Sequence, residues 1–254
     1  MKQKLFTDTN HSPKRKFGFT LAEVLITLAI IGVVAAMTMP TLIQHFQKKS
    51  LETQTQRFYS MMSQAVKQYM ADYGVDDLRN TPLACSSNPG TYEDSCDSSE
   101  SINSIKNFVT KYLNIVKICE QDECFANEYA TIDGSNDGLI QQSFDADLDF
   151  VLVDGNVVRM GYFNADSPIN LTVDVNGKKG PNKVGYDLWT MSIFYDGTID
   201  EGWLNPECKK NKELCFSSEN IDKLRDIRFQ ECLSYAQYGG CFGHFLENNF
   251  KFDY

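Results

Sequence analysis

The sequence has few of the residues on which catalytic sites are most often built. It contains only three histidines: His11 and His45 flank the N-terminal apolar run, and His244 lies near the other end. No serine sits in a G-x-S-x-G setting, so a Ser/His/Asp or Cys/His mechanism would have to rest on His244 alone. The chain also lacks a G-x-x-x-x-G-K-S/T phosphate loop and therefore supplies no ATPase activity. We expect that the protein is not an enzyme and requires no cofactor.

Positive charge is in deficit as well. The chain has 24 Lys and Arg against 34 Asp and Glu, a formal net charge of −10. Because five of the bases and one of the acids lie in residues 1–18, loss of that segment would leave a net charge of about −14. An acidic chain disfavours a nucleic-acid partner, so we expect none. Strong acidity is typical of a solvated surface, and it also suits proteins that bind divalent cations or work outside the cytoplasm.

Cysteine is missing from the N-terminal part of the chain. All eight cysteines follow the apolar run, at Cys85, Cys96, Cys119, Cys124, Cys208, Cys215, Cys232 and Cys241. An even number confined to one part of a chain predicts disulfides in an oxidising compartment. The alternative is free or zinc-binding thiols, but zinc usually requires Cys-x-x-Cys pairs and the spacings give none. The sequence leaves the pairing open, with four near-neighbour pairs as the arrangement of lowest entropy.

One long apolar run lies directly behind a polar, basic leader. The leader ends in Lys14-Arg15-Lys16-Phe17-Gly18, and the run from Phe19 to Met39 is long enough to span a bilayer as a helix. The basic flank keeps the leader in the cytoplasm and sends the rest of the chain across the membrane. A secretory signal peptide is the alternative. It would have a shorter apolar core with its cleavage site after the core, whereas here the glycine precedes it.

An acid, Glu23, interrupts the apolar run. A carboxylate in hydrocarbon costs several kcal/mol unless it is paired, so an acid inside a membrane segment is a functional-site hypothesis. If the chain is cut after Gly18, the new amine of Phe19 in a neighbouring subunit can pair with Glu23 and set the register of an assembly. The alternative is an acid that reaches the polar edge of the membrane.

The segment around residues 14–45 resembles the N-terminal cleavage and methylation motif of type IV pilins and type II secretion pseudopilins. The resemblance rests on Gly18, the aromatic Phe19, Glu23, the mid-helix Gly32 and Pro40. It implies cleavage between Gly18 and Phe19 by a prepilin peptidase and N-methylation of Phe19. It also implies assembly with other pilin or pseudopilin subunits by a platform protein and an ATPase of the same system. Glu23, Gly32 and Pro40 would act in assembly.

Four segments follow from this interpretation. They are a basic leader (1–18), a transmembrane and assembly helix (19–40), an amphipathic stalk helix (41–74) and an extracytoplasmic globular head (75–254). Pro40 is expected to kink or locally melt the helix. Beyond it, apolar residues recur at three- and four-residue steps up to Gly74, which offers a stop. They are Leu51, Phe58, Met61, Met62, Ala65, Val66, Tyr69, Met70 and Tyr73. We expect this face to pack on the head of the same chain.

The head reads as a helix followed by an antiparallel sheet. Apolar residues from Ile102 to Val116 line one face of a helix, and Asp154-Gly155-Asn156 marks a hairpin between two strands. Further strands are predicted at 169–175 and 188–195. The fold class is therefore α+β: a long N-terminal helix packed on a sheet of about four strands, as the resemblance also implies. From Asn205 a cysteine-rich extension follows, with a helix predicted over 219–235.

One loop between two predicted strands is rich in oxygen ligands. Asp174, Asn176, Asn182 and Asp187 together with backbone carbonyls would suit calcium, and some pseudopilins hold calcium in a nearby loop. The spacing is not that of an EF-hand, and a turn capped by these side chains is the alternative. A second acidic cluster, Asp145, Asp147 and Asp149, is interpreted as a solvated strand edge.

Two functions from different classes remain. The first is a structural subunit, a minor pilin or pseudopilin of a type IV pilus or type II secretion filament. It would be held in the inner membrane by one span, with lipid around its helix and its head outside the cytoplasm, before it enters a periplasmic or surface filament. The second is a singly anchored extracytoplasmic binding protein that does not polymerise. Retention of residues 1–18 would favour the second.

Overall fold

The computed structural model of the chain describes residues 18–83, 98–120, 123–134, 148–162, 169–202, 204, 221–234 and 240–254. Two compact units divide at Phe46 and Gln47, and each is described by itself. Several predicted features lie outside the described residues: the leader up to Phe17, the acids Asp145 and Asp147, and four of the cysteines, Cys85, Cys96, Cys208 and Cys215.

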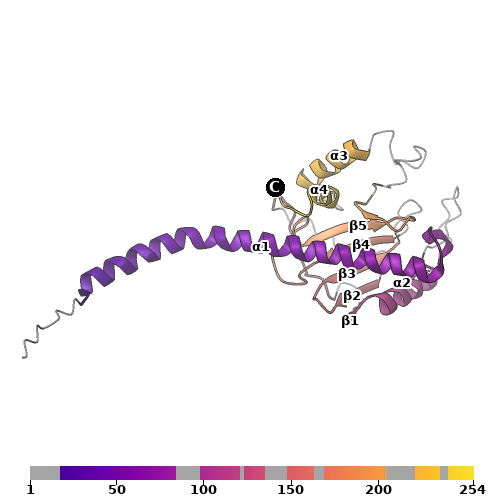
Figure 1. Cartoon of the computed structure of the whole chain (residues 1–254), viewed down its shortest axis with the longest axis horizontal. Helices are drawn as coiled ribbons and strands as arrows, with labels where there is room; N and C mark the ends of the chain where they lie inside the picture. The colour runs from indigo at the N-terminus through magenta and orange to yellow at the C-terminus, as the bar shows by residue number, and fades with distance from the viewer. Residues whose placement is uncertain are drawn as a thin grey trace, which may run out of the picture. The chain divides into compact units, whose positions relative to one another are not determined.

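The longest element is α1 (Leu21–Tyr73), which contains Pro40 (Figure 1). The helix continues through Pro40 without interruption, so of the two expected outcomes local melting is wrong, and a kink stays a prediction. Proline removes one backbone hydrogen bond, but the helical turns on both sides of it are intact and the residues around it favour helix. The part of α1 in the first unit is apolar and exposed. The part from Gln47 onward belongs to the second unit, Gln47–Tyr254, which we call the head from here on.

The head portion of α1 is amphipathic, as predicted. Its buried residues are Leu51, Glu52, Thr55, Phe58, Met62, Ala65, Val66, Tyr69 and Met70. The helix ends at Tyr73, and Gly74 adopts φ 65°, the left-handed conformation that a helix-ending glycine takes at low cost. The N–H of Val75 then bonds the carbonyl of Met70 at 3.1 Å, which closes the last turn. Burial of this face against the same chain confirms the expected packing of the stalk on the head.

A six-stranded antiparallel sheet forms the centre of the head. Its strands lie in sequence order: β1 (Ile115–Ile118), β2 (Leu148–Leu152), β3 (Val157–Gly161), β4 (Ile169–Asp174), β5 (Leu188–Ile193) and β6 (Ile199–Asp200). The predicted hairpin joins β2 and β3, where the N–H of Leu152 bonds the carbonyl of Asn156 at 2.9 Å. The α+β class is confirmed, with two more strands than the four expected.

The extra strand at one edge corrects the predicted helix. Helix α2 (Ser98–Tyr112) ends before Val116, which lies in β1 and is 67% exposed instead of lining a helix face. A short 3-10 turn, η1 (Leu78–Asn80), follows α1, and the N–H of its Leu78 bonds the carbonyl of Tyr195 at 2.8 Å. Strand β1 forms because Ile115 pairs with Leu152 of β2, a contact between residues far apart in the chain.

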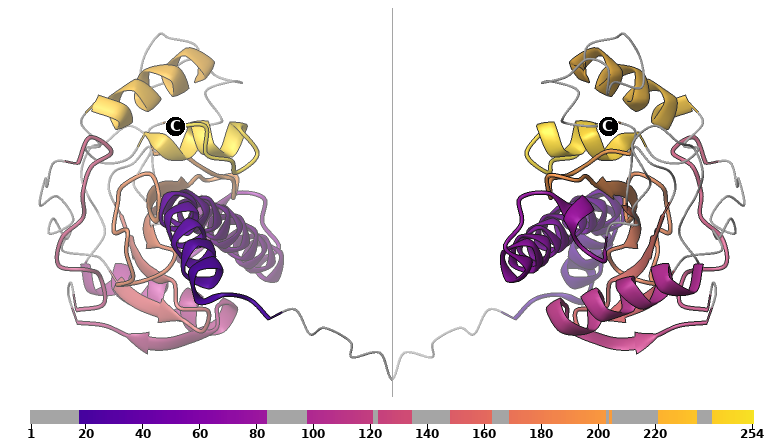
Figure 2. Two further views of the ribbon diagram at one scale, coloured as in Figure 1. Left: turned by 90° about the vertical axis from the view of Figure 1, so that its left-hand side faces the viewer. Right: turned by 90° about the vertical axis from the view of Figure 1, so that its right-hand side faces the viewer.

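The two faces of the sheet are covered differently. On one face the head portion of α1 and helix α2 pack on residues such as Phe150, Val158 and Met191 and form the main core. Side chains alternate along a strand, so Val157 and Leu188 join a separate core cluster, in which Phe125 and Tyr129 cover them. Figure 2 shows the sheet beside α1 and the two C-terminal helices next to its β5 end.

The C-terminal part adds two helices, α3 (Ile221–Ser234) and α4 (Cys241–Glu247). The first matches the helix predicted over 219–235. A disulfide between Cys232 and Cys241 joins the two helices, and Phe245 of α4 stacks on Trp189 of β5 with ring centroids 4.5 Å apart. The disulfide therefore holds α3 to α4, and the aromatic contact fixes α4 to the sheet.

Candidate processing and assembly segment

The Gly18–Phe19 bond lies outside the helix. Helix α1 begins at Leu21, and the side chain of Phe19 is 89% exposed. A peptide bond inside a helix must unwind before a peptidase can hold it in an extended form, because its backbone groups bond to neighbouring turns. A bond placed before the first turn needs no such unwinding, so this position suits proteolytic processing.

Thr20 and Glu23 form a capping box at the start of α1. The carboxylate of Glu23 accepts hydrogen bonds from the backbone N–H and the hydroxyl of Thr20, both at 2.8 Å. The N–H of Glu23 donates in return to the hydroxyl of Thr20 at 3.2 Å. This reciprocal pattern satisfies donors that the first turn of a helix leaves without partners. Glu23 therefore stabilises the start of the helix within its own chain, a role that sequence reasoning missed although Thr20-x-x-Glu23 is its signature.

The first unit exposes an apolar surface on every side. Leu21, Leu25, Leu28 and Ile31 are 58–78% exposed. Among the described residues, α1 is the one helix long and apolar enough to cross a membrane, and none of its most apolar window is buried within the protein. A surface of this kind has to be covered by lipid or by other apolar helices.

Gly32 lies within this exposed region. A Cβ atom added to it would have nothing within 4 Å, so the fold of the chain itself does not require a glycine there. In helix association within membranes, small residues let neighbouring backbones approach closely. The open surface around Gly32 is suited to such an approach by another helix.

The oxygen-rich loop between β4 and β5 holds two buried acids. Asp187 accepts hydrogen bonds from the backbone N–H groups of Asn182 and Lys183, at 2.7 and 2.6 Å. Asp174 accepts one from the hydroxyl of Tyr129 at 2.5 Å and one from the N–H of Asn176 at 3.1 Å. Both side chains are fully buried. These bonds fix the loop conformation with protein donors, as expected for the turn alternative.

The same loop also has features that suit a cation. Burial raises the pKa of Asp174 to about 7; the Tyr129 hydrogen bond lowers it and the nearby Asp187 carboxylate raises it. The amide oxygens of Asn176 and Asn182 are buried without a protein donor. Carboxylate and amide oxygens are the ligands calcium prefers, so the residues present fit such an ion. The described residues contain no group of three or more His, Cys, Asp or Glu side chains arranged for a metal.

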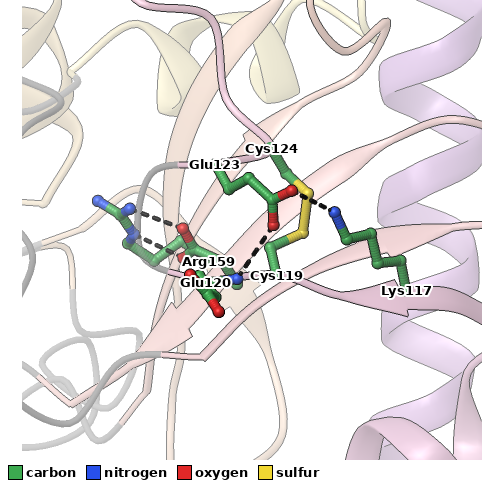
Figure 3. Close-up of a disulfide and its surroundings, with 7 residues drawn as sticks. Lys117, Cys119, Glu120, Glu123, Cys124 and Arg159 are labelled. Carbon is green, nitrogen blue, oxygen red and sulfur yellow. Dashed lines mark hydrogen bonds and ion pairs between the residues drawn. A yellow bond between two sulfur atoms is a disulfide. The ribbon is translucent and has the colours of Figure 1, made fainter.

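Two near-neighbour cysteine pairs form disulfides, Cys119–Cys124 and Cys232–Cys241. Figure 3 shows the first, beside an ion pair between Lys117 and Glu123 at 2.6 Å. The disulfide closes a short loop directly before Phe125, which together with Tyr129 covers Val157 and Leu188 on the second face of the sheet. Disulfide formation fits the oxidising compartment inferred from the cysteine pattern.

Beneath this segment lies a buried ion pair that sequence reasoning missed. Asp149 and Arg159 are directly opposite each other on β2 and β3 and make two hydrogen bonds of 2.7 Å. Their side chains are 4% and 7% exposed, and the guanidinium lies 5.2 Å from the ring of Phe125. The interpretation of Asp149 as part of a solvated edge is therefore wrong, because Arg159 and Phe125 enclose it.

His244 packs against an aromatic ring and lies beside an acid. Its ring stacks on Phe229 with centroids 3.7 Å apart, and its Nε2 lies 2.9 Å from a carboxylate oxygen of Asp253. These contacts tie α3, α4 and the end of the chain together.

The comparisons with known proteins agree with the two-part organisation. Residues 41–180 match the model of a family of unknown function (DUF6613), and residues 13–39 match the prokaryotic N-terminal methylation motif, the leader signature of pilins and pseudopilins. No curated protein and no solved structure matches the chain. The motif covers Gly18, Phe19, Glu23 and Gly32.

Proposed function

We propose that this chain is a minor pilin or a type II secretion pseudopilin. The chain belongs to the family of unknown function DUF6613, and it is a type IV pilin-like prepilin subunit. In this function a prepilin peptidase cuts between Gly18 and Phe19, and the amine of Phe19 is methylated. The mature subunit then polymerises through its apolar helix, driven by the platform protein and ATPase of the same system.

The observation that carries the proposal is the exposed apolar half of α1 next to its capped N-terminus. Lipid covers this surface before assembly, and helices of neighbouring subunits cover it in a filament. Glu23 and Gly32 lie on the same helix, one offering a charge and the other a small contact. In an uncut chain the carboxylate of Glu23 bonds Thr20, so a neighbour's amine would add to or replace those bonds.

The minor subunit or pseudopilin is favoured over a major pilus subunit by the head. The head carries a long C-terminal extension with four cysteines, two of which form the disulfide Cys232–Cys241. Compact heads pack more easily in a filament dominated by one subunit. The acidic balance and the absence of a basic leader from the mature form argue against DNA as a partner. The inner membrane, with the head outside the cytoplasm, is the location that the basic leader favours.

Intact mass and N-terminal peptide sequencing of protein from the native membrane test this function first. A chain that begins with N-methyl-Phe19 and that cross-links to other pilin subunits is the expected result. A chain that keeps Met1, or a cut beyond Ala36, would overturn it. The singly anchored binding protein would then be preferred, since it requires neither processing nor polymerisation.

We also propose that the loop holding Asp174 and Asp187 binds calcium, with Asn176 and Asn182 as further ligands. The two amide oxygens without protein donors support this, and a bound ion would neutralise two buried carboxylates. Calcium should raise the melting temperature of the full chain in detergent, and a chelator should reverse the rise. D187N should abolish the effect, whereas D226N, on the exposed side of α3, should retain it. An equal response to calcium in both variants would contradict the proposal.

A further inference from the structure

Four lysines gather at one end of the head. Lys49 and Lys251 both bond the same oxygen of Glu52, at 3.2 and 3.0 Å. Lys48 and Lys183 lie over the ring of Tyr186, with their Nζ atoms 5.4 and 5.0 Å from its centre. We call these four residues the lysine collar. They come from α1, from the β4–β5 loop and from the C-terminal segment.

Aromatic side chains join the two halves of the lysine collar. Phe252 stacks on Tyr186 with ring centroids 5.1 Å apart, and its N–H bonds Glu52 at 3.1 Å. Lys48 lies 5.8 Å from the Phe252 ring and donates to the backbone oxygen of Tyr254 at 2.8 Å. Two of the four amines therefore lie over partly exposed aromatic rings, and the other two bond Glu52, the acid that also accepts the N–H of Phe252.

The lysine collar is basic in an acidic protein. The carboxylates beside it are Glu52, which two of its lysines share, Asp253, which is paired with His244, and the buried Asp187, which accepts a hydrogen bond from the backbone N–H of Lys183. Four positive charges thus outnumber the acids next to them, whereas the whole chain has a net charge of −10. Lys49 and Lys251 keep 56% and 50% of their side-chain surface exposed despite their ion pairs.

In the sequence, Lys48 and Lys49 of the lysine collar directly follow the exposed apolar residues of α1. Leu42, Ile43 and Phe46 extend the exposed apolar surface of α1 beyond Pro40, at 54%, 54% and 63% exposure. Lys48 follows Phe46 by two residues of the same helix, a rise of about 3 Å. The exposed apolar surface from Phe19 to Phe46 is longer than the hydrocarbon core is thick, so a helix that buries all of it in a bilayer has to tilt. Lys48 and Lys49 then follow this surface at or close to headgroup level.

We propose that the lysine collar binds the headgroups of anionic phospholipid while the subunit resides in the membrane. Lysine amines donate hydrogen bonds to phosphate oxygens, and aromatic rings beside them are characteristic of the membrane interface. The collar would hold this end of the head against the lipid surface until the subunit is extracted into an assembly. This goes beyond the proposed function, since an anchored protein that never polymerises would make the same contact.

Anionic lipid is favoured over an acidic protein partner by continuity with the membrane segment. The collar begins two residues beyond an apolar surface that lipid covers. Each lysine close to an anionic lipid surface raises the affinity of a protein for that surface roughly fivefold. Two lysines, Lys67 and Lys106, are exposed elsewhere on the head and serve as internal controls. Lys67 is 19 residues beyond Lys48 on α1, about 28 Å along the helix axis.

The test uses the full chain in nanodiscs of phosphatidylcholine alone or mixed with phosphatidylglycerol. Each lysine is acetylated for short times and its modification is followed by mass spectrometry. The collar lysines should react several-fold more slowly when phosphatidylglycerol is present, and high salt should remove the difference because it screens exposed charges. Lys67 and Lys106 should react equally in both lipids. Equal rates for the collar lysines in both lipids would overturn the proposal.

A pair of matched variants gives a second measurement. K49Q/K183Q should reduce the phosphatidylglycerol retained by the purified protein by roughly an order of magnitude, and K67Q/K106Q should leave it unchanged. Hydrogen exchange of residues 248–254 confirms that the first variant keeps its fold. Identical lipid retention in both variants would contradict the proposal. Protection that appears in pure phosphatidylcholine and grows with protein concentration would also contradict it, and would assign the collar to an acidic protein surface.

Discussion

Glu52 on the stalk helix and Phe252 near the end of the chain are joined by a hydrogen bond of 3.1 Å, from the backbone N–H of Phe252 to the carboxylate of Glu52. The same carboxylate accepts a hydrogen bond from Lys251 at 3.0 Å and is largely buried. Burial raises the pKa of Glu52, but hydrogen bonds from Lys251, Phe252 and Lys49 outweigh it and hold the pKa below its ordinary value. One buried acid thus fixes the C-terminal segment to α1.

E52A should therefore loosen the C-terminal segment and destabilise the head. Hydrogen bonds to a charged group contribute about 1.5–3 kcal/mol, and Phe252 N–H would lose its acceptor. The change is measured by thermal unfolding of the full chain in detergent and by faster hydrogen exchange at residues 250–254. As a control, E231A removes an acid from an exposed ion pair with Arg228 and should change stability by less than about 1 kcal/mol. Equal effects of E52A and E231A would show that Glu52 does not fix the segment.

The ion pair between Asp149 and Arg159 should behave as a buried unit. R159M leaves a carboxylate enclosed by Phe125 and the sheet, so it should destabilise the head by roughly 3–5 kcal/mol. The double variant D149L/R159M removes both charges and should recover much of that loss. Urea unfolding of the four forms gives the coupling energy between the two residues. Additive effects of the two single changes would mean that the pair is not coupled.

Asp174 should make stability fall as pH rises. Its pKa is raised by burial to about 7, whereas an unfolded chain has a value near 4. Between these values the folded protein holds a proton that the unfolded chain has lost. Folding stability from this group is therefore full below pH of about 4 and declines up to about 7, by at most about 1.4 kcal/mol per pH unit.

D174N removes this titration, so its stability should decline less with pH than that of the unaltered protein. The comparison is made in calcium-free buffer, because a bound cation would favour the ionised form. D226N, which changes an exposed acid of α3, is the control and should follow the unaltered protein. Parallel pH curves for D174N and the unaltered protein would rule out Asp174 as the source of the slope.

Local patterns predicted the elements whose contacts are close in sequence. The hairpin at Gly155 and the helix end at Gly74 both depend on glycines with positive φ, and the sequence marks both. Strand β1 was not predicted, because Ile115 and Val116 continue the helical spacing of the residues before them. Its partner Leu152 is distant in the chain and overrides that local preference.

Charged residues were harder to place than apolar ones. Alternating acids resemble a solvated edge, and Asp149 is buried only because Arg159 lies opposite it in the folded sheet. The lysine collar combines residues from three distant parts of the chain, so no sequence window contains it. The processing segment was predictable because Gly18, Phe19 and Glu23 lie within six residues and their chemistry is local.

Glu23 offers the sharpest test of assembly, because two roles can be separated at one residue. As a helix cap it accepts hydrogen bonds from Thr20, and a neutral glutamine can still accept them. As the partner of a neighbouring Phe19 amine it needs its negative charge. E23Q should therefore be cut normally after Gly18 and keep its helix, but its incorporation into filaments should fall as far as that of E23A.

The expected loss is large because removal of one partner leaves the other charge buried and unpaired, at roughly 3–5 kcal/mol for each subunit contact. Processing is followed by intact mass and incorporation by the amount of subunit in sheared or cross-linked filaments. T20A is the matched control: it removes the hydroxyl of the cap, keeps the carboxylate and should still assemble. If E23Q assembles normally while E23A and T20A fail, capping is the role of Glu23 and the charge pair is excluded.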